Sequence, residues 1–221
     1  MQLPLIVLLA ALSFALVGLG AQAGSSNAID EPISQEAAIS GDPDKPRRHF
    51  RVRDPARLEP AAATTIYRDL ADDLADIYAL SGDKASAGYQ KWRRYNTSPY
   101  LSVTHGHRYV NNYASDLASD YGRYEQSGVL PVGVIIAKDS LAVTRDGGVF
   151  PGPMFLMEKM APGFSNATGD WRYTMIMPDG SLFGVTKGKN SERVEYCIGC
   201  HLARERFDHL YYPPRKFRAS P

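Results

Sequence analysis

The sequence predicts an α+β fold in which N-terminal helices precede an antiparallel β-sheet domain, with a short cysteine motif near the C-terminus. Three observations support this prediction. Apolar residues recur at helical spacing between residues 64 and 80. Runs of β-branched and aromatic residues, separated by turn residues, follow Gly128. The only two cysteines of the 221-residue chain stand three positions apart, at 197 and 200.

The composition is that of an ordinary globular protein. Hydrophobic residues make up 44% of the chain and charged residues 22%, which argues against a disordered or fibrous protein. The formal net charge is only +1, so no overall field attracts nucleic acid or an anionic membrane. We therefore expect no nucleic-acid partner, and any other partner must be inferred from a local site.

An almost unbroken apolar run covers residues 3–19 and is followed by small residues, with Ala21 and Ala23 at the positions that signal peptidase requires. We expect residues 1–23 to be a cleaved signal peptide and the mature protein to be periplasmic. The alternative is a retained N-terminal anchor, because Met1 and Gln2 supply no positive charge and the run approaches the roughly 20 apolar residues of a membrane span.

Residues 24–63 contain several prolines and no regular hydrophobic period, which predicts a flexible linker. The domain is then expected at 64–221. Its first helix is predicted from the apolar positions Ile66, Leu70, Leu74 and Ile77 and should end near Gly82. Two more helices are predicted over 86–94 and over 111–127, the latter stopped by Gly128. The first half of the domain should therefore be mainly helical.

The second half is predicted to form strands. The expected strands cover 132–138, 141–144, 154–160, 171–177 and 182–186. Asp146-Gly147-Gly148 is typical of a hairpin turn, and Pro178-Asp179-Gly180-Ser181 should connect the last two strands in antiparallel order.

Cys197-Ile198-Gly199-Cys200-His201 has the spacing of a c-type haem attachment motif. In such a motif two thiols bond to the porphyrin and the following histidine binds the iron. We predict one covalent haem c at Cys197 and Cys200, with His201 as proximal ligand. Assembly of such proteins takes place outside the cytoplasm, which agrees with an exported chain.

The cysteine pair has two other possible uses, a redox dithiol and a zinc site. A redox dithiol would follow an early strand of a βαβ unit, whereas this pair lies near the C-terminus behind an antiparallel region. A zinc site would need a second ligand pair, and His209 is the only further candidate nearby. Both alternatives fit the sequence less well than haem does.

A sixth iron ligand would have to come from upstream of the motif. The candidates are Met154, Met157, Met160, Met175, Met177, His105 and His107. Core packing is the favoured interpretation of the methionines. An iron without a sixth ligand has an open face, which indicates ligand binding or catalysis in place of pure electron transfer.

The order of these segments resembles the cytochrome P-460 family. The resemblance covers about residues 89–217 and rests on 109–128, 132–139, 152–160, 169–173 and 195–201. It implies a homodimer and, in enzymatic members, a lysine bonded to a haem meso carbon and oxidation of hydroxylamine with nitric oxide handled on the way. Lys138 is the matching position. The strand period also places Lys138 on the apolar face of Val134 and Ile136. Alternatively, Lys138 reaches solvent or pairs with Glu158.

An enzyme of this kind needs a group that accepts protons from the substrate. Glu192 is the first candidate for this proton relay, and Glu158 and Glu195 are lesser ones; each could equally be a solvated surface acid. Arg108 or His107 could reach haem propionates. We expect a hydroxylamine- or nitric-oxide-type substrate and an exported redox partner. The rival expectation is a non-enzymatic cytochrome that binds nitric oxide or carbon monoxide or carries electrons.

Overall fold

The computed structural model describes residues 44–220. The expected signal peptide, and the expected linker as far as residue 43, lie outside these residues and stay predictions. Among the described residues, no helix is both long and apolar enough to span a membrane. All described residues belong to one unit of the chain.

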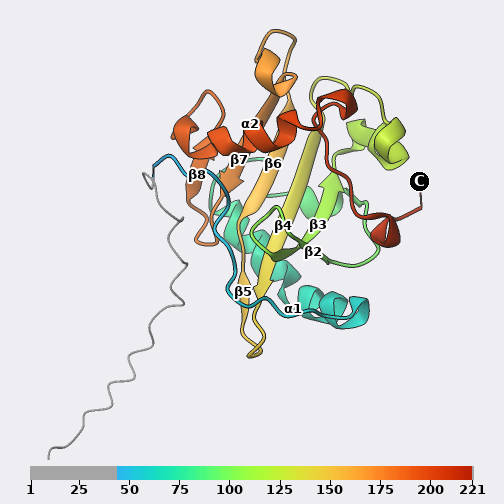
Figure 1. The fold of residues 1–221 in the computed structure, drawn as a ribbon, viewed down its shortest axis with the longest axis vertical. Coiled ribbons are helices and arrows are strands. Elements are labelled where there is room, and N and C mark those ends of the chain that lie inside the picture. Colours follow the sequence, from blue (N-terminus) through green and yellow to red (C-terminus); the bar gives the residue numbers. More distant parts are fainter. Residues whose placement is uncertain (1–43, 221) are drawn as a thin grey trace, which may run out of the picture. The chain divides into compact units, whose positions relative to one another are not determined.

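An antiparallel sheet of eight strands forms the centre of the described part (Figure 1). Its main path is β1-β3-β4-β6-β7-β8, while β2 pairs with β3 and β5 pairs with β4. The strands are β1 (Arg93–Arg94), β2 (Tyr100–Ser102), β3 (Arg108–Ala114), β4 (Ile135–Val143), β5 (Val149–Pro151), β6 (Met154–Lys159), β7 (Trp171–Ile176) and β8 (Leu182–Val185). The predicted α+β class is confirmed.

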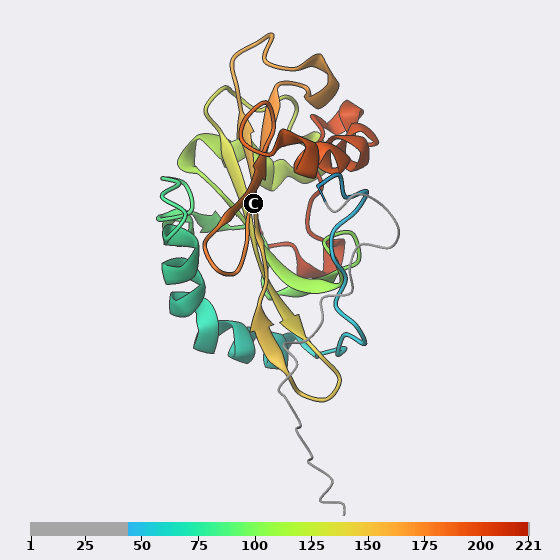
Figure 2. The same ribbon diagram turned by 90° about the vertical axis from the view of Figure 1, so that its left-hand side faces the viewer.

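The helical elements cover both faces of this sheet. They are α1 (Pro60–Ala79), η1 (Tyr89–Lys91), η2 (Asp116–Gln126), η3 (Asn166–Thr168), η4 (Ser191–Val194), α2 (Glu195–Leu202), η5 (Glu205–Phe207) and η6 (Arg215–Phe217). Figure 2 shows α1 on one face and α2 on the other, with the segment that precedes α1 on the same face as α2. Strand β4 therefore separates two cores, with Ala137 and Leu141 on the α1 side and Val134 and Ile136 on the other.

The first predicted helix is confirmed as α1, although it begins at Pro60, within the segment expected as linker. Proline suits this first helical position because its missing N–H would have no partner there. Leu74 and Tyr78 face the sheet and are completely buried. The preceding residues are also packed, since Ala56 and Leu58 contact the same core.

The helix predicted over 86–94 is wrong, and the one predicted over 111–127 is present only from Asp116 on, as a 3-10 helix. Residues 86–94 form only η1 and the short strand β1, and the first part of 111–127 is β3, followed by the 3-10 segment η2. The tyrosines at 109 and 113 mimic a helical period, but every residue of β3 is buried. A strand covered on both faces loses the polar alternation that identifies strands in a sequence.

The second half agrees better with prediction. The hairpin of β7 and β8 and the turn at 146–148 between β4 and β5 are both present. The two strands expected at 132–138 and 141–144 are one continuous strand, β4. Asp139 and Ser140 do not interrupt it, because their side chains form hydrogen bonds inside the protein.

Candidate functional site

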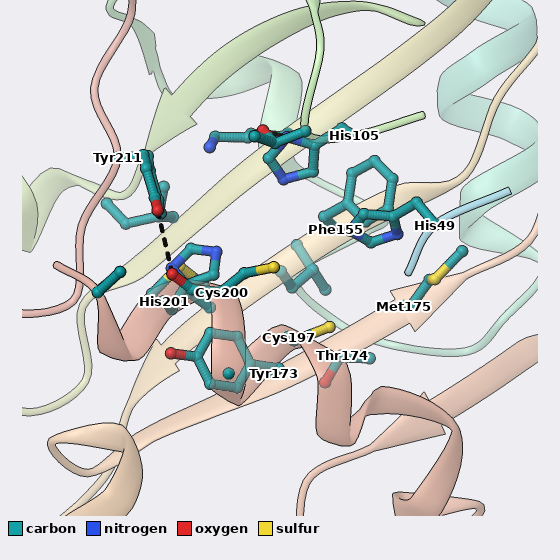
Figure 3. A pocket seen from close by; sticks show the side chains of 17 residues that line it. His49, His105, Phe155, Tyr173, Thr174, Met175, Cys197, Cys200, His201 and Tyr211 are labelled. Carbon is teal, nitrogen blue, oxygen red and sulfur yellow. Dashed lines mark hydrogen bonds between the residues drawn. The ribbon is translucent and has the colours of Figure 1, made fainter. Parts of the chain in front are cut away.

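A cavity of about 230 Å³ lies between the sheet and α2 (Figure 3). On the same measure one water molecule needs only about 10–15 Å³, so this cavity is suited to a much larger guest. Most of its wall is apolar. Its lining residues are His49, Thr104, His105, Ile136, Lys138, Phe155, Leu156, Met157, Tyr173, Thr174, Met175, Cys197, Gly199, Cys200, His201, Ala203 and Tyr211.

Helix α2 carries the whole cysteine motif. Residues three and four apart share one face of an α-helix, so Cys197, Cys200 and His201 all reach the cavity. Both cysteines are free thiols. Burial, and then the nearby Cys200, raise the pKa of Cys197 to about 12, which keeps its sulfur protonated. The three groups that a c-type haem uses therefore face one space.

The His201 ring is fixed in a definite orientation. Its Nδ1–H donates to the backbone carbonyl of His209 over 2.7 Å, and the rings of Tyr173 and Tyr211 contact it at centroid distances of 5.0 and 5.2 Å. Burial, reinforced by Lys138, lowers the pKa of His201 to about 3. The imidazole is therefore neutral, with Nε2 as its free acceptor, which is the form that binds a metal.

The carbonyl that receives this bond belongs to a tightly held turn. Asp208 and His209 both have positive φ, 53° and 62°. The Asp208 carboxylate pairs with Lys159 Nζ at 2.5 Å and accepts from the Leu130 N–H at 2.9 Å. Its backbone carbonyl accepts from Trp171 Nε1 at 2.8 Å. We call these contacts the Asp208 clamp; it holds the turn that orients His201.

Lys138 also faces the cavity, on the same side of β4 as Ile136. Only 6% of its surface is exposed, yet its amine has no hydrogen bond or ion pair with any described residue. Burial lowers its pKa to about 8. Glu158, the alternative partner, pairs instead with Arg172 across β6 and β7. An unpartnered buried amine is costly, which makes Lys138 the least structurally explained charge of the cavity.

An aromatic group lies on the side of the cavity opposite His201, as Figure 3 shows. The imidazoles of His49 and His105 are stacked with centroids 5.2 Å apart, and Phe155 lies 4.8 Å from each. His105 Nδ1 is hydrogen bonded to Ser102 Oγ at 3.0 Å. Burial lowers the pKa of His105 well below its usual range, so the ring is neutral, and its Nε2 has no hydrogen bond with the described residues.

Sequence reasoning missed His49 as a site residue. It lies in the segment expected as linker, where its Nδ1 is hydrogen bonded to the Tyr196 hydroxyl at 2.8 Å. No periodicity or motif surrounds it, so only the tertiary structure identifies it. Among the suggested sixth ligands, His105, Met157 and Met175 line the cavity, whereas His107 lines a separate surface pocket.

The remaining candidates lie elsewhere. Glu192, in η4, is half-buried and does not line the cavity, and Glu195 is exposed. No carboxylate is found among the described lining residues. Arg108 is buried and donates to the backbone carbonyls of Phe50 and His105.

The zinc interpretation gains no support from the geometry. The His209 ring packs against Gly169 and lines a different pocket from the one that the cysteines line. Within residues 44–220 no group of three or more potential ligands is placed to hold a metal ion. Comparison with known proteins adds no assignment, because no family model and no curated protein matches this sequence significantly.

Proposed function

We propose that this chain is an exported mono-haem c-type cytochrome of the P-460 type, which oxidises hydroxylamine or handles nitric oxide. One observation carries the proposal: a single apolar cavity brings together two free thiols, a neutral imidazole with an available Nε2 and an unpartnered buried lysine. The proposed cofactor is one haem c, held by Cys197 and Cys200 with His201 as iron ligand. The proposed location is the periplasm.

The side chains that line the cavity suit a haem group. Two thiols and an imidazole on one helix face satisfy the attachment motif, and an apolar wall suits a porphyrin. When bound, haem supplies an iron that binds a small nitrogen compound and accepts its electrons. The hydrogen bond from His201 to the His209 carbonyl keeps Nε2 directed to the cavity and raises the basicity of the ring.

Lys138 is the residue proposed to bond to the haem. With a pKa of about 8, a substantial fraction of its amine is uncharged near neutral pH, and this is the nucleophilic form. Its position on the cavity wall supports the assignment that the family resemblance implies. No carboxylate among the described lining residues competes for the amine.

Oxidation of hydroxylamine releases protons, which a nearby base must accept. With Lys138 bonded to the haem, His49 and His105 are the nitrogen bases on the described cavity wall besides His201, and burial lowers the pKa of both. Because Nδ1 of His105 is tied to Ser102, its Nε2 is left to face the cavity. Glu192 stays a predicted relay that would have to act from outside the lining.

The absorption spectrum of protein matured in a cell competent for cytochrome c assembly tests the proposal. We expect a coloured protein whose reduced Soret band is shifted toward 460 nm, and a haem peptide whose mass shows that Lys138 travels with it. Lys138→Met should keep the haem and show an ordinary c-type band, whereas the double variant Cys197→Ala, Cys200→Ala should lack covalent haem. A colourless wild-type protein with both thiols free would refute the haem assignment.

A second candidate function has one observation in its favour. Without a carboxylate in the described lining, the cavity is mainly aromatic and apolar, as expected for a cytochrome that only binds nitric oxide or carbon monoxide or carries electrons. Hydroxylamine turnover with an added electron acceptor distinguishes the two. Reversible gas binding without turnover, together with an ordinary Soret band, would select the non-enzymatic function.

A further inference from the structure

Five arginines line a surface groove beside the residues that follow helix α2. They come from three segments: Arg123 from η2, Arg204 and Arg206 from the residues after α2, and Arg215 and Arg218 from the C-terminal segment. Figure 1 shows that C-terminal segment, in red, beside the green helical segment that follows β3. Among the described lining residues Glu125 is the only acid. We call this surface the arginine groove.

Most of this positive charge is not neutralised. Arg218 forms a two-fold hydrogen bond with Glu125, at 2.6 and 2.8 Å. Arg123 lies 3.6 Å from Asp120, but both side chains are more than half exposed, so this pair is weak. Arg204 and Arg206 instead lie over the ring of Phe207, with guanidinium-to-centroid distances of 4.3 and 4.4 Å.

Arg215 is exposed and has no ion pair with the described residues. Glu205, and Asp116 and Asp120 on η2, are further exposed acids on the segments that form the groove, but none of them lines it. The groove therefore presents a clear excess of positive charge to solvent, although the whole chain is nearly neutral. A local excess of this kind attracts a partner of opposite charge.

One aromatic side chain contacts both the groove and the cavity. The guanidinium of Arg204 lies 5.3 Å from the ring centroid of Tyr211, and the centroid of that ring lies 5.2 Å from that of His201. Tyr211 also donates to the carbonyl of Cys200 at 3.0 Å and lines the cavity itself. Charge on the outer surface and the proposed iron ligand are thus connected by one residue.

We propose that the arginine groove is the docking surface for an electron-accepting protein with an acidic surface. This inference rests on the proposed function. The step is the transfer of one electron from the reduced haem iron to the oxidised metal centre of the partner, so the iron is oxidised and the partner is reduced. Exposed arginines on three segments suit a broad macromolecular surface, and the Tyr211 contact places that surface next to the site that must be oxidised.

Stopped-flow oxidation of the reduced haem protein tests the proposal, with an acidic c-type cytochrome and a basic c-type cytochrome as acceptors. For the acidic acceptor we expect the second-order rate to fall steeply with ionic strength, since exposed charges are screened. Arg206→Glu and Arg215→Glu should each lower this rate about tenfold at low salt. Both should raise the rate with the basic acceptor.

Arg68→Glu is the matched control, because it makes the same charge change on α1, at the other face of the sheet. Equal rate losses for Arg68→Glu and Arg206→Glu would overturn the proposal, as would rates that do not depend on salt. Retention on a cation exchanger provides a readout that needs no haem: the groove variants should elute at lower salt than Arg68→Glu.

The outcomes separate the two proposals. Coloured protein with unchanged spectra, but no preference for the acidic acceptor, overturns the docking surface and leaves the proposed function standing. Colourless protein overturns the proposed function and the electron-transfer role together, whatever its retention. Binding of wild type to phosphatidylglycerol vesicles that Arg206→Glu loses, while the same variant leaves the rates unchanged, would also contradict a protein partner at this groove.

Discussion

Two adjacent residues of β4 show opposite ways of burying a charge. Asp139 points toward α1 and accepts hydrogen bonds from Tyr67, Tyr89 and Asn111, at 2.6, 2.9 and 3.1 Å. Lys138 points to the other face, into the cavity, and has no partner among the described residues. Burial raises the pKa of Asp139, whereas the same hydrogen bonds act to lower it; Lys138 experiences burial alone.

The difference distinguishes a buried charge with a structural role from one with a chemical role. A buried charge whose hydrogen-bonding capacity is filled holds its neighbours together, as Asp139 holds α1 to the sheet through Tyr67. A buried charge without partners contributes nothing to packing and costs desolvation energy, so its retention calls for a ligand or a reaction. This distinction can be tested at Asp139, at Lys138, at the Asp208 clamp and at His105.

The largest effect is expected at Asp139. Asp139→Ala should lower the free energy of unfolding by about 3–5 kcal/mol, because three buried donors lose their acceptor. Lys138→Met should cost little or stabilise the protein, since it removes an unpartnered charge at similar volume. Urea unfolding of both variants in the full chain checks this. A larger loss for Lys138→Met than for Asp139→Ala would reverse the comparison.

The pH dependence of stability is the second test and concerns Lys138 before haem is attached. Its pKa in the folded protein is about 8, against an ordinary value of 10.5. Between these values the unfolded chain binds more protons, so stability must rise with pH through this window. The cost of burying the charged amine is fully present below about pH 8 and disappears above about pH 10.5.

We therefore expect wild type to gain on the order of 3 kcal/mol relative to Lys138→Met between about pH 7 and pH 11. Urea unfolding of the two proteins, made without cytochrome c maturation, measures the gap at each pH. In haem-loaded protein with a bonded Lys138 the gap should not vary with pH. A stability difference between haem-free wild type and Lys138→Met that does not change with pH would show that the Lys138 amine has a partner in the folded protein.

The sequence predicted which residues meet at the cavity better than it predicted the fold around them. The spacing of Cys197, Cys200 and His201 and the direction of Lys138 follow from the local sequence and from the strand period, which tertiary contacts do not alter. In the structure Lys138 and His201 line one cavity, as the prediction of a shared haem requires. Both features depend on residues that are close together in the chain.

The missed parts depend on distant contacts. Strand β3 was read as helix because its buried Asn111 and Asn112 look like surface residues until their partners are known. The side chain of Asn111 is bonded to Asp139, and that of Asn112 to Tyr100 and Tyr121, and only folding brings these residues together. His49 was missed for the same reason, since only folding brings it against His105. Buried polar networks and aromatic stacks leave no local periodicity to recognise.

The contacts of the Asp208 clamp stabilise the fold and also orient His201. Disrupting one of them should therefore change both the stability and the properties of the site. Trp171→Phe removes the N–H that holds the Asp208 carbonyl and should cost about 2 kcal/mol of stability. Because the turn also presents the His209 carbonyl to His201, the reduction potential and the iron–histidine stretching frequency should shift as well.

A matched variant separates the two roles of the clamp. Arg172→Gln, next to Trp171, disrupts only the half-exposed pair with Glu158 and should leave potential and frequency unchanged. If Trp171→Phe lowers stability without moving either haem property, the clamp supports the fold but does not orient the proximal ligand.

The smallest effect is expected at His105, whose imidazole is partnered on one nitrogen and open on the other. Ser102→Ala removes the hydrogen bond to Nδ1 and should cost only about 1 kcal/mol of stability. The freed ring can rotate, so carbon monoxide bound to the reduced haem should show a broader or shifted C–O stretching band in the infrared. Thr104→Ala is the control, since its contact to the same nitrogen is longer, 3.3 Å against 3.0 Å. An unchanged C–O band in Ser102→Ala would mean that His105 does not face the open coordination position.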